Sequence, residues 1–236
     1  MTGPRADPES DADLGAGTRP APGAVAIAGG GPGGALLAYL LARAGIPVTL
    51  CESRADFERE YRGDSLHPYT MDVLDQLGLV EDVLQIPHVK ADAFRFHTPS
   101  GVVTAASYAR LPTRFDFVAI MPQARLIEFL LERAAAYPHF SLRTSAKVTG
   151  LTQQNRRVTG LRHRDGRGQQ ELRTALVVGA DGRNSAIRRY ADLPVTSSGA
   201  STDLVWFRLP RRHDDPPADL DLYCGPGQYL GVLGGP

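Results

Sequence analysis

The strongest constraint in this sequence is a cluster of five glycines and one proline at residues 29–34. A short apolar run at residues 24–28 precedes the cluster, and an Ala- and Leu-rich stretch at residues 33–44 follows it. A second apolar run occupies residues 47–51. Short apolar runs bounded by glycine are typical of buried parallel strands, and the stretch between them favours a helix. The region therefore predicts a β-α-β unit with a right-handed crossover.

Three glycines of this cluster, Gly29, Gly31 and Gly34, satisfy the pattern G-x-G-x-x-G. The first allows a tight turn, the second allows a pyrophosphate to approach the backbone, and the third allows the helix to pack closely on the strand. Pro32 and Gly33 lie in the same turn, where the helix begins. Because the N–H groups and positive dipole of a helix N-terminus bind phosphate, we expect all five residues to contact a dinucleotide.

The acidic residue Glu52 directly follows the second apolar run. In a dinucleotide site this position accepts hydrogen bonds from the ribose hydroxyls of the adenosine. A carboxylate there favours an unphosphorylated ribose, which means NAD or FAD rather than NADP in this site. The alternative interpretation is a solvated carboxylate at a strand end. We include the next two residues, Ser53 and Arg54, in the expected cofactor site.

A second motif lies about three quarters of the way along the chain. Residues 176–178 predict a buried strand that runs into Gly179-Ala180-Asp181-Gly182, with Ser185 at an expected helix start. Judged alone, this pattern also fits an ordinary strand, turn and helix in which Asp181 is a capping residue.

With both motifs in place, residues 24–236 resemble the group A flavoprotein monooxygenases, the para-hydroxybenzoate hydroxylase-like aromatic hydroxylases. The resemblance implies that Asp181 and Gly182 contact FAD and help to accommodate a reduced pyridine nucleotide. It also implies a pyrophosphate or NADPH contact for Arg62 and a ribityl contact for Gln123. The alternatives are a surface arginine and a residue that merely begins a helix.

The family resemblance implies an enzyme that uses FAD, NAD(P)H and O₂ to hydroxylate an organic, aromatic or polyketide-like substrate. Because the cofactor supplies the difficult chemistry, no catalytic side chain is expected of the polypeptide. Six aromatic side chains could line an apolar substrate pocket: Phe94, Phe96, Phe117, Trp206, Phe207 and Tyr223.

The predicted fold is α/β, a Rossmann-like FAD-binding domain with a mixed or antiparallel substrate-domain sheet. We expect a disordered leader at residues 1–22, an FAD-binding domain at residues 23–90 and 121–190, and part of a substrate sheet at residues 91–120 and 191–236. Apart from the β-α-β unit, helices are expected at residues 68–77 and 123–136. Further strands are expected at residues 94–96, 102–104, 115–120, 140–143, 147–151, 158–163, 170–173, 176–178, 204–209, 220–223 and 229–233.

Composition excludes several other classes of protein. The chain carries 26 basic and 26 acidic residues, which argues against a nucleic-acid-binding protein. Its two cysteines are too few for a disulfide framework or a zinc cluster, and Cys51 lies on a predicted buried strand as inert packing. The six histidines lack metal-ligand spacing, no G-x-S-x-G motif indicates a hydrolase, and no apolar run is long enough for a membrane helix. We expect a cytoplasmic protein.

One departure from the family pattern is serious. Members carry a third signature, a G-D motif followed by a helix, and residues 183–236 contain none. We therefore expect an apparently truncated, N-terminal part of a flavoprotein. Two alternatives stay open: a non-catalytic FAD-binding fragment or remnant, and a flavin-dependent reductase or oxidase of the same superfamily. The oligomeric state and the choice between NADH and NADPH also stay open.

Overall fold

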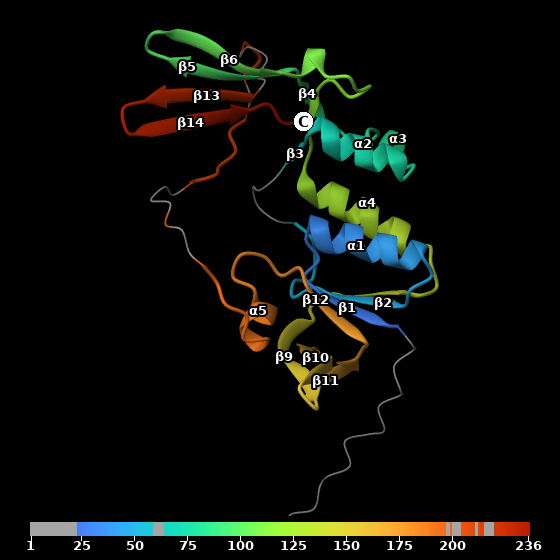
Figure 1. Cartoon of the computed structure of the whole chain (residues 1–236). Helices are drawn as coiled ribbons and strands as arrows, with labels where there is room; N and C mark the ends of the chain where they lie inside the picture. The colour runs from blue at the N-terminus through green and yellow to red at the C-terminus, as the bar shows by residue number, and fades with distance from the viewer. Residues whose placement is uncertain (1–22, 59–63, 197–198, 200–203, 211, 215–219) are drawn as a thin grey trace, which may run out of the picture.

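The computed structural model describes residues 23–58, 64–196, 199, 204–210, 212–214 and 220–236. The expected leader and Arg62 lie outside these residues. A parallel sheet in the order β12-β1-β2-β8 forms the centre of the molecule (Figure 1). Its strands are β1 (Val25–Ala28), β2 (Val48–Cys51), β8 (Phe140–Arg143) and β12 (Leu176–Gly179).

Two helices cover one face of this sheet. α1 (Pro32–Arg43) and α4 (Gln123–Ala135) lie side by side above the strands (Figure 1). Their buried side chains, among them Ala38 and Ile127, join Ile27 of β1 and Leu50 of β2 in the largest hydrophobic core. This arrangement confirms the β-α-β unit that the glycine cluster predicts.

The opposite face of the parallel sheet carries a second layer. It consists of an antiparallel sheet and the short helix α5 (Ala186–Tyr190) (Figure 1). The strands of this sheet are β9 (Lys147–Gln154), β10 (Arg157–Asp165) and β11 (Gly168–Arg173). Cys51 of β2 is buried against this layer, and burial raises the pKa of its thiol to about 11, which makes the thiol unreactive.

The remaining elements form the upper part of the molecule in Figure 1. A small sheet has the order β3-β7-β4, and a mixed sheet has the order β14-β13-β5-β6, in which only the β13–β5 pairing is parallel. The elements of this region are β3 (Ser65–Leu66), α2 (Pro68–Gln76), α3 (Val80–Val83), β4 (Val89–Ala91), β5 (Ala93–Thr98), β6 (Gly101–Ser107), the 3₁₀ helix at Tyr108–Arg110, β7 (Val118–Ile120), β13 (Leu220–Gly225) and β14 (Gln228–Leu233).

Two strand predictions require correction. Residues 204–209 form no strand, and only Val118–Ile120 of the range 115–120 is a strand. The apolar residues at 204–209 favour a strand, but these side chains are exposed, with Val205 at 82%. Strand propensity alone does not make a strand, because stability comes from packing against neighbouring strands. None of the helices in the described part of the chain is long and apolar enough to cross a membrane.

A buried histidine joins the two sheets of the lower half. His163 of β10 is completely buried, and Nη1 of Arg143 on β8 lies 2.8 Å from its Nε2 atom. Because a guanidinium only donates hydrogen bonds, this Nε2 must accept one, which leaves the ring neutral with its proton on Nδ1. Burial and the Arg143 charge lower the pKa of His163, although Asp165 opposes them.

Because the pKa of His163 is lowered in the folded chain, we predict that the protein is less stable at acidic pH. In the unfolded chain His163 binds a proton below about pH 6.5, whereas in the folded chain it does so only at a lower pH. The free energy of unfolding therefore falls as the pH drops below about 6.5, by up to about 1.4 kcal/mol per pH unit. Urea unfolding of wild type and His163→Gln between pH 8 and pH 5 measures the effect. Glutamine keeps an acceptor for Arg143, so the variant should show a shallower profile; parallel profiles would contradict this role.

Candidate cofactor-binding site

Three parallel strands bring the two sequence motifs to one edge of the central sheet. β1 lies between β2 and β12, and all three run in the same direction. Beyond their carboxyl ends, the Gly29 amide donates to the Cys51 carbonyl at 2.8 Å and the Ala180 amide donates to the Ala28 carbonyl at 2.8 Å. The glycine-rich turn, Glu52 and the turn at Asp181 therefore lie beside one another, at the place where open α/β sheets bind ligands.

Two glycines are required by the close packing of this turn. Gly29 has a φ of +105°, and a β-carbon on it would lie 2.5 Å from the Ala180 carbonyl oxygen. A β-carbon on Gly34 would collide with the Gly29 carbonyl oxygen and would lie 3.3 Å from the Ala180 β-carbon. These contacts match the roles that the pattern assigns to its first and third glycines.

The start of α1 leaves room for an anion. A β-carbon on Gly33 would meet nothing within 4 Å, so the backbone of the first turn is accessible there. Gly31 precedes the helix in an extended conformation, Pro32 is the first helical residue, and the first turn contains no acidic side chain. The first N–H groups of a helix lack intrahelical partners, and no carboxylate of this turn would repel a phosphate.

Glu52 is a buried component of the same turn. Its side chain is 3% exposed, which excludes the interpretation as a solvated carboxylate. Oε2 accepts a hydrogen bond from the Gly30 amide at 2.8 Å, and Oε1 accepts from the Ser53 hydroxyl and the Arg54 amide at 3.0 Å each. The sequence did not point to Gly30, whose missing side chain leaves room for Phe57 at 2.8 Å from its ideal β-carbon position.

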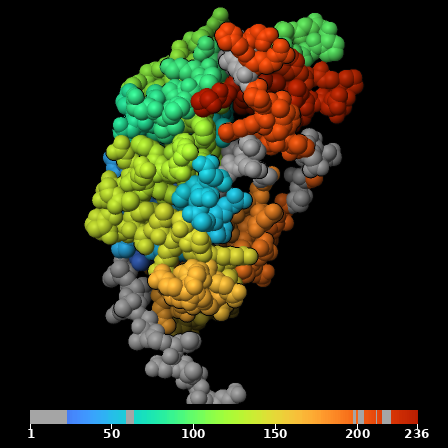
Figure 2. All heavy atoms as spheres, turned by 180° about the vertical axis from the view of Figure 1, so that it is seen from behind, coloured from blue at the N-terminus to red at the C-terminus, as the bar shows by residue number. Residues whose placement is uncertain are grey.

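The segment that follows β2 covers Glu52 from outside. Ser53, Arg54 and Asp56 are exposed, whereas the Phe57 ring is buried against the turn. Figure 2 shows this segment in light blue on the rear surface, between the yellow-green and orange parts of the chain. The structure brings Glu52, Ser53 and the Arg54 backbone together with the glycine turn.

Asp181 organises the second turn. Oδ1 accepts a hydrogen bond from the Ser185 hydroxyl at 2.6 Å, and Oδ2 accepts from the amides of Ala186 and Ile187 at 2.6 and 3.1 Å. Ser185 in turn caps α5 by accepting from the Arg188 amide at 3.0 Å. The carboxylate thus performs the capping role that the sequence left as an alternative. Gly182, with a φ of +82°, completes the turn.

Gln123 begins α4, as the sequence predicts, and it lies next to a residue that the sequence did not single out. The Gln123 amide donates to Asp64 Oδ1 at 3.1 Å, and the Met121 amide donates to the Asp64 carbonyl at 2.7 Å. No pattern in the sequence marks this contact, because an aspartate remote in sequence from a helix start is not recognisable as its cap.

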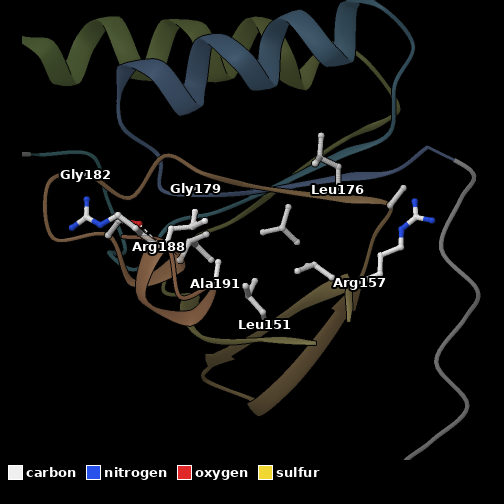
Figure 3. Close-up of a pocket in the computed structure, with 13 residues that line it drawn as sticks. Leu151, Arg157, Leu176, Gly179, Gly182, Arg188 and Ala191 are labelled. Carbon is white, nitrogen blue, oxygen red and sulfur yellow. Dashed lines mark hydrogen bonds between the residues drawn. The ribbon is translucent and has the colours of Figure 1, made fainter. Parts of the chain in front are cut away.

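A cavity of about 610 Å³ lies below the parallel sheet, on the side away from α1 (Figure 3). Apolar residues of β9, β12 and α5 line most of it, and Gly179, Gly182 and Arg188 border one end. The cavity therefore adjoins the back of the Asp181 turn rather than the glycine-rich turn. Within the described residues, no group of three His, Cys, Asp or Glu side chains could hold a metal ion.

The pairing register of β5 and β13 shows which of the aromatic residues proposed for the substrate pocket share a face of the mixed sheet. Phe94 and Phe96 pair with Leu220 and Leu222, and the two phenylalanine rings are 5.0 Å apart. Alternate residues of a strand share a face, so these four side chains form one apolar face of the mixed sheet. We call it the inner face, because Phe94 packs against the buried cluster around Ile120.

The other four aromatic residues lie elsewhere. Tyr223 is on the opposite, outer face, where its ring stacks on His97 at 4.3 Å. Phe117 belongs to the main core below the mixed sheet. Trp206 and Phe207 are 46% and 58% exposed in the extended segment 204–209. Of the six aromatic candidates, the structure places Phe94 and Phe96 together.

Comparison with protein families gives a match over most of the chain. The model described as "FAD binding domain" matches residues 23–219. The 6-methylpretetramide 4-monooxygenase of Streptomyces rimosus is 36% identical over 194 residues, which cover 80% of this chain and 46% of that protein. This chain thus spans about half the length of that relative.

Solved structures give the same fold. The p-nitrophenol 4-monooxygenase PnpA of Pseudomonas putida DLL-E4 superimposes with a TM-score of 0.63 at 26% identity, covering 70% of this chain and 42% of that one. PqsL of P. aeruginosa in complex with 2-aminobenzoylacetate gives a TM-score of 0.64 at 27% identity, covering 75% of this chain and 47% of that one.

We predict that substitution by alanine changes the stability far more at Gly34 than at its neighbour Gly33. Gly34→Ala should lower the free energy of unfolding by about 1–3 kcal/mol, because the added methyl group collides with the Gly29 carbonyl. Gly33→Ala is the matched control and should change it by less than about 1 kcal/mol, because its methyl group meets open space within a helix. Urea denaturation measures both. Equal destabilisation would contradict the described packing of the turn.

Proposed function

Because this chain belongs to the FAD-binding domain family, we propose that it is the cofactor-binding part of a flavoprotein monooxygenase. The enzyme uses NAD(P)H and O₂ to hydroxylate an organic, aromatic or polyketide-like substrate. One observation carries the proposal: the glycine-rich turn, Glu52 and the Asp181 turn meet at one edge of the parallel sheet. The names of the similar proteins support hydroxylation as the reaction.

The glycine-rich turn holds the pyrophosphate of FAD in this proposal. Gly29 and Gly34 shape the turn, while Gly31, Pro32 and Gly33 form the helix start that faces the phosphates. The open space at Gly33 and the absence of a carboxylate from the first turn fit a group with two negative charges.

The ribose of the adenosine binds at Glu52. Hydrogen bonds from the Gly30 amide, the Ser53 hydroxyl and the Arg54 amide hold this carboxylate in one orientation. A ribose hydroxyl can therefore donate to an already oriented carboxylate. A 2′-phosphate at the same position would meet a negative charge, which favours FAD or NAD over NADP at this site.

The remaining contacts lie toward the flavin end of the cofactor. We assign Gln123, at the start of α4, to the ribityl chain. Arg62, which the family resemblance assigns to the pyrophosphate or NADPH, lies outside the described residues. Asp181 and Gly182 contribute the second turn at this edge of the sheet, in which the Asp181 carboxylate also holds the start of α5.

Bound FAD supplies electron transfer from NAD(P)H and the activation of O₂. The residues of this chain bind the cofactor, orient it and exclude water. The organic substrate contacts the inner face of the mixed sheet, where Phe94, Phe96, Leu220 and Leu222 provide an apolar surface that suits an aromatic ring. Free Cys51 and Cys224 support a reducing, cytoplasmic location.

FAD titration tests the proposed cofactor. The chain should bind FAD, with quenching of the flavin fluorescence and a shifted visible spectrum. Gly31→Asp should weaken the affinity at least about a hundredfold, because it places a β-carbon and a negative charge against the pyrophosphate.

The matched control is Gly166→Asp, which makes the same change in the turn between β10 and β11, where an added β-carbon meets open space. Binding that tolerates Gly31→Asp, or a wild-type chain that ignores FAD, would contradict the proposal. Bound FAD without turnover indicates the binding-fragment alternative, and substrate reduction without incorporation of oxygen indicates a reductase.

The two faces of the mixed sheet predict a difference in substrate use. Phe96→Ala should raise the KM for an aromatic substrate by about tenfold, because it removes an apolar contact on the inner face. Tyr223→Ala on the outer face should change the KM less than about twofold. NAD(P)H consumption with product analysis measures both. A larger effect at Tyr223 would place the substrate on the other face.

A further inference from the structure

A single carboxylate joins three parts of the molecule. Asp64 precedes β3, and its side chain contacts the start of α4 through Oδ1 and Arg208 of the extended segment through Oδ2. The distance from Oδ2 to Nη2 of Arg208 is 3.1 Å. Segment 204–209 lies between the parts of the chain that form α5 and the mixed sheet.

The contact with α4 replaces a cap that the local sequence lacks. The residue before α4 is Pro122, which forms no side-chain cap, and the first turn contains no acidic residue. Asp64 supplies both missing features: an acceptor for the Gln123 amide and a negative charge at the positive end of the helix. The Asp64 carbonyl also binds the Met121 amide, and the adjacent Ser65 pairs with Ile120, so the backbone of Asp64 is fixed by the small sheet.

The contact with Arg208 is of a different kind. The side chains of Arg208 and Asp64 are 58% and 27% exposed, so solvent and salt screen the pair. The structure therefore has one firm attachment, at the helix, and one that can open, at the extended segment.

From these contacts we infer that Asp64 is a positioning residue that fixes Gln123 for the cofactor and attaches segment 204–209 to the same point. The inference rests on the proposed FAD-binding function for its cofactor side. Asp64 acts through Gln123 and Arg208, and it forms no contact with the cofactor itself in this assignment. Through its two oxygens, Asp64 connects the start of α4, which we assign to the flavin end of the site, to segment 204–209, which precedes β13 of the mixed sheet.

Three variants separate the two attachments. Asp64→Asn keeps an oxygen for the Gln123 amide and loses the charge that holds Arg208. Asp64→Ala loses both attachments, and Arg208→Gln loses only the second. Arg212→Gln is the matched control, because Arg212 pairs locally with Asp214 at 3.3 Å.

Two measurements need no bound cofactor. Hydrogen exchange at the first amides of α4 should accelerate about tenfold in Asp64→Ala and stay within about twofold of wild type in Asp64→Asn and Arg208→Gln. Trp206 is the only tryptophan of the chain, so its fluorescence reports on segment 204–209 alone. Its acrylamide quenching should rise about twofold in Asp64→Ala, Asp64→Asn and Arg208→Gln, and in wild type at about 0.5 M salt.

The third measurement is FAD affinity, which should fall about tenfold in Asp64→Ala and less than about threefold in Asp64→Asn. Unchanged exchange at α4 in Asp64→Ala, or unchanged Trp206 quenching in Asp64→Asn and Arg208→Gln, would overturn the inference, as would an effect of Arg212→Gln equal to that of Arg208→Gln. A wild-type chain that fails to bind FAD contradicts the proposed function instead, and the exchange and quenching results then still decide the role of Asp64.

Discussion

Backbone atoms of Gly29 and Ala180 lie so close that a β-carbon on Gly29 would come within 2.5 Å of the Ala180 carbonyl oxygen. This approach is possible only because Gly29 lacks a side chain and adopts a φ of +105°. It allows β12 to pair with β1 up to the last residue of each strand, and Gly34 then fits against the Gly29 carbonyl. α1 and the Asp181 turn follow the ends of β1 and β12, so their positions depend on this contact, and Glu52 follows β2 on the other side of β1.

Glu52 and Asp181, the two carboxylates that the sequence singles out, stabilise the folded turns in which they lie even without a ligand. Glu52 fixes the Gly30 amide, and Asp181 fixes the first amides of α5. A site built in this way is preorganised, because the cost of orienting its groups is met during folding rather than during binding. In the proposed site, mutations of Glu52 and Asp181 should therefore lower stability and cofactor affinity together.

Much of the lower half of the molecule could be predicted from the sequence, since the signals for β1, α1 and β2 are local: apolar runs, a glycine turn and a glycine after the helix. The strand at 204–209 was predicted wrongly because apolar residues can also lie exposed in an extended segment. The faces of Phe96 and Tyr223 depend on the register between β5 and β13, which are far apart in sequence. The capping of α4 by Asp64 was equally inaccessible, because no local pattern marks a cap supplied by a residue remote in sequence.

The order of strands in the central sheet also has a consequence for synthesis. β1 pairs on one side with β2, which follows it closely, and on the other side with β12, which is made much later. While the ribosome adds the intervening residues, β1 and β2 can already pair around α1, but the other edge of β1 stays open. An open apolar strand edge is a template for wrong pairing, and contacts between distant residues close slowly. The time needed to synthesise the chain up to β12 therefore determines how long the open edge of β1 can form aggregating contacts.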